Sequence, residues 1–109
     1  DQGRHAEAFA QFDRLLARKP DDFAALYQLG RVAAVSGQRL ADGAAALHRY
    51  LAQPNLPGEL PRPQHAHYRF GQILARQGDP AAARAAFEAA LQLDPKFKEA
   101  AAELKKLQP

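Results

Sequence analysis

Two segments of this chain follow one pattern, 75 residues apart. Residues 2–20 (QGRHAEAFAQFDRLLARKP) and residues 77–95 (QGDPAAARAAFEAALQLDP) both begin with a glutamine and a glycine. Each continues with an alanine, a phenylalanine four positions later and a proline eight positions after that: Ala8, Phe12 and Pro20, then Ala83, Phe87 and Pro95. Recurrence at a fixed spacing indicates a stack of similar units rather than one irregular core.

A second recurrence lies between these two segments. Residues 26–37 (LYQLGRVAAVSG) and residues 67–78 (HYRFGQILARQG) share an inner glycine and a closing glycine seven positions later. These glycines are displaced by 41 residues, which is 34 + 7, and the first displacement of 75 is 34 + 34 + 7. We therefore expect the seven extra residues in the turn at Gln38-Arg39 and in the loop of residues 53–63, which contains four prolines.

Residues that break or cap helices divide the chain into segments of about 12–16 residues. The breaks are KPDD (residues 19–22), SGQ (36–38), the proline-rich loop, GDP (78–80) and Asp94-Pro95. Between them, apolar residues recur at helical spacing. Examples are Phe12, Leu15 and Leu16, then Leu26, Leu29 and Ala33, then Phe87, Leu91 and Leu93. No segment alternates like a strand, so the sequence predicts an all-α fold of about six helices in antiparallel pairs.

A 34-residue unit with Leu-Gly in its first helix, Ala-x-x-x-Phe in its second and a closing proline resembles the tetratricopeptide repeat. The resemblance covers nearly the whole chain and implies a single domain, residues 1–109, folded as a right-handed α-α superhelix. Residues 2–20 resemble the second helix of a partial repeat, and residues 23–55 resemble an irregular repeat. After the 53–63 loop, residues 64–95 resemble a regular repeat and residues 96–107 a C-terminal capping helix. The first-helix aromatic of the family is replaced by Leu26 and by His67.

The small residues of the pattern have a packing explanation. Gly30 and Gly71 lie inside predicted helices, where a glycine costs about 1 kcal/mol in helix propensity. We expect them where a neighbouring helix approaches closely, opposite the large side chains of Leu47 and Phe87. The alanines of the second helices are expected to serve the same purpose: Ala8, Ala83 and Ala90.

Composition excludes several classes of protein. The 109 residues contain no cysteine, which excludes disulfides and thiol chemistry, and no apolar run approaches the ~20 residues of a membrane span. The net charge of +3 comes from interspersed charges, without the basic stripe of a nucleic-acid binder. We expect a soluble protein, and the alanine- and arginine-rich composition suggests a bacterial source. The sequence leaves cytoplasm and periplasm open.

Catalytic and metal-binding patterns are missing, so we predict no enzyme activity, no metal and no cofactor. Ser36, the one serine, is interpreted as a turn residue. His65 and His67 are two apart and would point to opposite sides of a helix, which argues against a shared metal ion. The resemblance to the repeat puts His67 at the position of the first-helix aromatic and so implies a packed core histidine. His5 and His48 read as surface residues. The environment of Phe9, core or surface, stays open.

In the family that this chain resembles, the first helix of each pair lines a concave groove that binds partners. Helical spacing puts tyrosines, arginines and other polar residues on that face: Tyr27, Gln28, Arg31, His65, Tyr68, Arg69, Gln72 and Arg76, with Glu99, Glu103 and Lys106 on the capping helix. Arg31, Arg69 and Arg76 could grip a carboxylate, which predicts an acidic protein or peptide partner. The alternative is that these arginines are solvated or paired with Glu99 and Glu103.

Two functions fit the sequence. One is a scaffold that binds a protein or peptide and has no chemistry of its own. The other is an accessory or oligomerisation module of an enzyme whose catalytic domain lies elsewhere. The chain begins at Asp1 rather than at a methionine, which predicts a segment of a longer protein. We also expect the apolar stripe of Ala8, Phe12 and Leu15 to be partly uncovered. The first helix should then either fray or pack against a partner, and a second copy of the chain could be that partner in a homo-oligomer.

Overall fold

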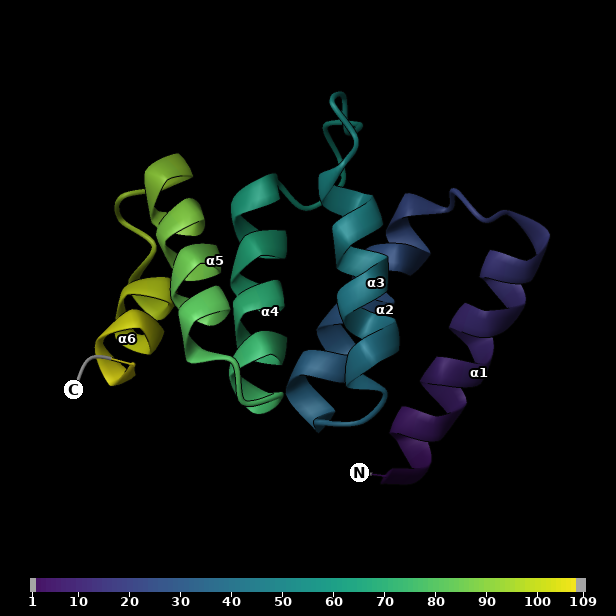
Figure 1. Ribbon diagram of the computed structural model, residues 1–109. Coiled ribbons are helices and arrows are strands. Elements are labelled where there is room, and N and C mark those ends of the chain that lie inside the picture. The colour runs from purple at the N-terminus through teal and green to yellow at the C-terminus, as the bar shows by residue number, and fades with distance from the viewer. Residues whose placement is uncertain (1, 108–109) are drawn as a thin grey trace.

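The computed structural model describes residues 2–107 of the chain as a row of helices (Figure 1). Within that range there are six α-helices and no strand, which confirms the predicted all-α fold. Their bounds are α1 Gln2–Arg18, α2 Phe23–Ser36, α3 Leu40–Leu51, α4 Pro63–Arg76, α5 Pro80–Leu93 and α6 Lys98–Lys106.

Short-range chemistry explains where the helices begin and end. The carboxylates of Asp22 and Asp79 each accept a hydrogen bond from the backbone N–H three residues later, at 3.1 Å, and so cap α2 and α5. Pro63 and Pro80 occupy the first turn of their helices, where a missing N–H costs nothing. Gly37 ends α2 with a φ of 76°, a left-handed conformation that glycine adopts without strain.

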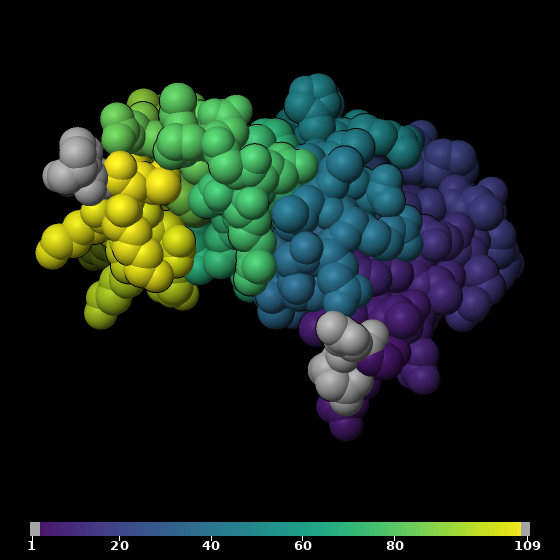
Figure 2. Space-filling model, turned by 60° about the horizontal axis from the view of Figure 1, so that its bottom comes forward, coloured from purple at the N-terminus to yellow at the C-terminus, as the bar shows by residue number. Residues whose placement is uncertain are grey.

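The helices stack in chain order. α2 packs on α3 and α4 on α5 as pairs, α1 packs on α2, α4 also contacts α2 and α3, and α6 closes the row against α5. Figure 1 shows α1 and α6 at opposite ends, and Figure 2 shows the same succession of colours from another side. The molecule measures 42 × 32 × 19 Å. This arrangement is the helical solenoid expected from the repeats.

Glycines inside helices lie where a neighbouring helix approaches most closely. A β-carbon placed on Gly71 would lie 2.6 Å from Cε1 of Phe87, and one on Gly30 would overlap the side chain of Leu47. Phe87 and Leu47 are both fully buried, so neither can move aside at low cost. The small-against-large packing expected from the sequence is present at both sites.

The structure decides the burial of three residues that helical spacing alone does not. Leu93, one of the apolar residues that recur at helical spacing, has a side chain that is 55% exposed at the end of α5. Phe9, which the sequence left open, is buried in the main core cluster. Tyr50 is fully buried, and its hydroxyl donates a 2.7 Å hydrogen bond to the carbonyl oxygen of Pro61. That bond ties the proline-rich loop to α3.

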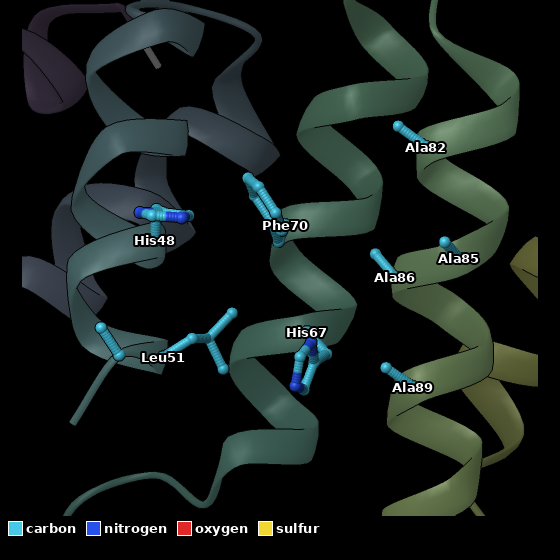
Figure 3. A pocket seen from close by; sticks show the side chains of 9 residues that line it. His48, Leu51, His67, Phe70, Ala82, Ala85, Ala86 and Ala89 are labelled. Atoms are coloured by element: carbon cyan, nitrogen blue, oxygen red, sulfur yellow. The ribbon is translucent and has the colours of Figure 1, made fainter. Parts of the chain in front are cut away.

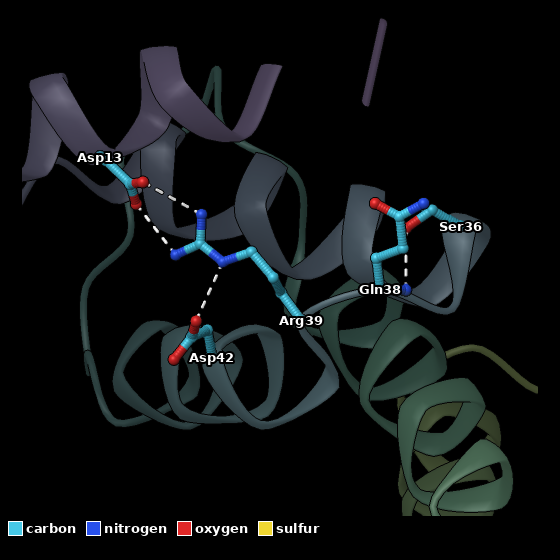
Figure 4. A network of polar contacts seen from close by, with 5 residues as sticks. All are labelled: Asp13, Ser36, Gln38, Arg39 and Asp42. Carbon is cyan, nitrogen blue, oxygen red and sulfur yellow. Dashed lines mark hydrogen bonds and ion pairs between the residues drawn. The ribbon is translucent and has the colours of Figure 1, made fainter. Parts of the chain in front are cut away.

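An arginine in the α2–α3 turn fastens α1 to α3 (Figure 4). The guanidinium of Arg39 donates two hydrogen bonds to Asp13 of α1, at 2.9 and 3.0 Å, and one to Asp42 of α3, at 2.9 Å. The same guanidinium lies 5.0 Å from the centre of the Phe9 ring. In the same turn, Ser36 accepts a hydrogen bond from the N–H of Gln38, so this serine has the turn role that the sequence predicted.

Candidate interaction surface

The side chains of one α4 face are joined by hydrogen bonds. Arg69 donates to the Gln72 side-chain oxygen at 3.0 Å, and the Gln72 amide donates to the Tyr68 hydroxyl at 3.2 Å. These residues are neighbours because positions three and four apart lie side by side on a helix. The Arg69 guanidinium also lies 5.2 Å from the centre of the Tyr68 ring. The three side chains therefore form one ordered polar group.

Tyr68 connects this group to the last two helices. Its ring lies 5.1 Å from the ring of Phe97, before α6, and 6.1 Å from that of Phe87 in α5. Burial raises the pKa of the Tyr68 hydroxyl, Arg69 opposes the rise, and the nearby carboxylates of Glu103 and Glu99 add to it. The acidic side chains of α6 therefore face this part of α4. The ring of His65 packs edge-on against Phe97 as well, at 5.2 Å.

The other end of α4 reaches α2. Arg76 donates a 3.3 Å hydrogen bond to the carbonyl oxygen of Val35, in the last turn of α2, where carbonyls lack helical partners. The guanidinium passes so close to Gly37 that a β-carbon there would lie 2.5 Å from it. On α2 itself, Arg31 donates to the side-chain oxygen of Gln28 at 2.8 Å. The face therefore continues from α2 across α4 to α6.

One residue predicted on this face is not there. Tyr27 is only 6% exposed, and its ring packs 5.5 Å from that of Tyr50. The prediction was wrong because α2 is covered by α1, α3 and α4 together, which leaves a narrower exposed strip than helical spacing alone suggests. We call the remaining set the first-helix face: Gln28 and Arg31 of α2 with His65, Tyr68, Arg69, Gln72 and Arg76 of α4.

The arginines of the first-helix face bind neutral acceptors. Among the described residues, Arg31, Arg69 and Arg76 have hydrogen bonds to amide or carbonyl oxygens, and none forms an ion pair with a carboxylate. The alternative pairing with Glu99 or Glu103 is not formed, since Glu103 pairs with Lys106 at 3.2 Å. No ion pair therefore neutralises these three guanidinium groups within the part of the chain that the structure describes.

A second concave site lies on the opposite side of α4. The sequence analysis did not predict this site. We call this hollow of about 420 Å³ the outer trough. It lies between α3 and α5 with α4 as its floor (Figure 3), and its lining residues are His48, Leu51, Ala52, His67, Phe70, Ala82, Ala85, Ala86 and Ala89. The alanines at spacings of three and four along α5 were the signal that could have revealed it.

The histidines of the outer trough differ from one another in exposure. His48 is exposed, as the sequence predicted, whereas His67 is half-buried rather than packed in the core. Burial lowers the pKa of His67, which favours the neutral imidazole at pH 7. Because the trough opens beside it, this histidine keeps partial access to solvent.

Within residues 2–107, no group of three or more His, Cys, Asp or Glu side chains is placed to hold a metal ion. A search for membrane-spanning segments over the same residues found no helix with the required length and hydropathy.

Comparisons with known proteins agree with the repeat pattern. Two models of the tetratricopeptide repeat match the chain, one over residues 1–58 and one over residues 64–97. Searches of curated proteins and of solved structures returned no match. The first match alone spans more than half of the 109 residues, and the second covers the regular repeat, α4 and α5. The chain therefore belongs to the tetratricopeptide repeat family.

Proposed function

We propose that this chain binds an acidic segment of a partner protein along the first-helix face and has no chemistry of its own. Repeats of this family mediate protein–protein interaction and are typically non-catalytic scaffolds. The observation that carries the choice of face is its set of arginines, Arg31, Arg69 and Arg76, which are held in place by neutral acceptors.

These arginines are suited to carboxylates for a physical reason. A guanidinium has five N–H donors in a fixed planar arrangement, and the internal bonds of each side chain use only part of them. The same bonds restrict the side chains before a partner arrives, which lowers the entropy lost on binding. A carboxylate can then accept two parallel hydrogen bonds from one guanidinium.

The distribution of charge favours one direction of binding. Arg31 and Arg76 lie at the α2 end of the face, whereas Glu99 and Glu103 act on Tyr68 from α6. An acidic residue of the partner is therefore favoured at the α2 end and disfavoured near α6. Tyr68 and His65 offer aromatic surface between the two ends.

Selection of binders from a random peptide library tests this proposal. We expect the selected peptides to be rich in Asp and Glu, and their binding to weaken about tenfold or more in Arg31→Glu or Arg76→Glu, since each variant loses a charged hydrogen-bond donor. Arg14→Glu on α1 makes the same charge change away from the face and should leave binding within about twofold. Selected peptides that bind all three variants equally would contradict the proposal.

A further inference from the structure

We propose that the outer trough binds a second copy of this chain, which inserts its own α5 there to form a two-fold symmetric dimer. This surface faces away from the first-helix face and does not depend on the proposed peptide binding. Three features support the dimer: the pattern of α5, the absence of Asp, Glu, Lys and Arg from the trough and the residues left exposed beside it.

α5 carries a straight apolar stripe that extends beyond the trough. Ala82, Ala86, Ala89 and Leu93 are four, three and four residues apart, which places them in one line along the helix. Ala82, Ala86 and Ala89 line the trough, and Leu93 lies one turn further along. Among the described residues, Leu93 and Val35 are the large apolar side chains that remain exposed, at 55% and 51%.

This stripe is complementary to itself when two copies of α5 run antiparallel. A two-fold axis midway between positions 87 and 88 places residues whose numbers add to 175 opposite one another. Leu93 of each copy then meets Ala82 of the other, and Ala86 meets Ala89. Two-fold dimers use the same patch on both copies, so such a self-complementary stripe is what they require.

The proposed contact follows the packing rule of the chain itself. Inside the molecule, the large side chains of Phe87 and Leu47 lie against the glycines 71 and 30. In the antiparallel dimer the large Leu93 lies against the small Ala82 in the same manner. A parallel dimer would place Leu93 against Leu93 and leave the alanines facing each other across a gap, which forfeits packing contacts. The antiparallel arrangement is therefore the favoured one.

The charged side chains of the protein do not oppose a second copy at this site. Each copy carries a net charge of +3, so two copies repel one another overall. No Asp, Glu, Lys or Arg is among the residues that line the trough, so none of these groups meets the stripe of the second α5 there. The trough thus offers mainly apolar surface to that stripe, without a carboxylate, ammonium or guanidinium group to anchor a charged partner.

The dimer would also cover apolar side chains that the single chain leaves half-buried. Phe70 lies on the floor of the trough and Leu51 on its α3 wall (Figure 3), and both remain partly accessible. Covering them removes apolar surface from water without displacing any ordered hydrogen bond of these side chains.

Sedimentation velocity over a concentration series tests the proposal. We expect a concentration-dependent dimer whose dissociation constant rises by roughly tenfold or more in Leu93→Gln, since each dimer loses two buried leucines. Ala85→Arg, at an exposed position that lines the trough, should have a similar effect. Val35→Gln removes the other exposed large apolar side chain and serves as the matched control, with no change expected. A monomer up to about 1 mM, or a dimer insensitive to both trough variants, would overturn the proposal.

Chemical cross-linking tests the register directly, because the chain has no cysteine of its own. Ala82→Cys copies mixed with Leu93→Cys copies should join through a short bismaleimide, as these positions face one another. Leu93→Cys copies alone should join poorly, because their thiols would be about 16 Å apart along the helix axis, eleven residues at 1.5 Å each. Equal cross-linking of the mixture and of Leu93→Cys alone would refute the antiparallel register.

Discussion

Replacing Gly71 by leucine should destabilise this protein more than leucine at Gly58 or alanine at Gly78. A β-carbon at position 71 would lie 2.6 Å from Cε1 of Phe87 and 2.8 Å from its Cδ1 and Cζ. The Phe87 ring is fully buried, and the ring of Tyr68 lies 6.1 Å from its centre, so it cannot swing away without disturbing the α4–α5 contact.

The magnitude follows from two opposing terms. Overpacking of a filled core costs about 1–3 kcal/mol, and leucine adds three carbons beyond the β-carbon, so the upper part of that range applies. Replacing a glycine inside a helix by leucine raises the unfolding free energy by about 1 kcal/mol through helix propensity. The net loss is about 2 kcal/mol, a substantial share of the 5–15 kcal/mol of a typical domain. For a chain of this size the melting temperature should fall by about 8–16 °C.

Two other glycines separate the possible causes. Gly58 has open space around its α-carbon, so Gly58→Leu should change the stability by no more than about 0.5 kcal/mol. Gly78 also has open space but a φ of +83°, so Gly78→Ala should cost about 1 kcal/mol through backbone strain alone. The expected order of damage in thermal or urea denaturation is Gly71→Leu, then Gly78→Ala, then Gly58→Leu.

A double-mutant cycle identifies the contact responsible. Combining Gly71→Leu with Phe87→Leu should cost at least about 1 kcal/mol less than the sum of the two single changes, because the smaller side chain makes room. Equal melting temperatures for Gly71→Leu and Gly58→Leu, or strict additivity in the cycle, would refute the close-approach explanation.

Particular contacts give three further predictions. The pKa of Asp13 is lowered, chiefly by its hydrogen bonds from Arg39, so this contact contributes stability above about pH 4 that is lost as the pH falls through the lowered pKa. Asp13→Asn should flatten that part of the plot of unfolding free energy against pH. The effect should be no more than about 1 kcal/mol, because the pair is exposed. Tyr50→Phe should cost about 1 kcal/mol and speed proteolysis within residues 53–63, unless the bond to Pro61 contributes nothing, in which case cleavage rates would match. Amide exchange should be faster in α1 than in α5, because α1 packs mainly on α2 and leaves Phe12 and Leu15 partly exposed; equal protection would show that α1 is self-sufficient.

Local signals in the sequence were enough to specify the fold of this protein. The 34-residue period, the capping residues Asp22 and Asp79 and the helical spacing of apolar residues appear in the structure as helix ends and buried faces. Gly30 and Gly71 could be interpreted from sequence as well. A glycine inside a helix costs free energy, so its presence indicates a neighbour that comes close, and the large residue of the repeat pattern indicates which neighbour.

The candidate surfaces depended on tertiary structure. Helical spacing placed Tyr27 and Tyr68 at equivalent positions, but α2 is enclosed by three helices, so only Tyr68 keeps access to solvent. The outer trough lies between second helices that are not adjacent in the chain, and the side chain of Leu93, at the end of α5, stays exposed. A period along one helix shows which residues share a face, whereas the burial of that face depends on the spacing and tilt of its neighbours, which are set by packing across the whole stack.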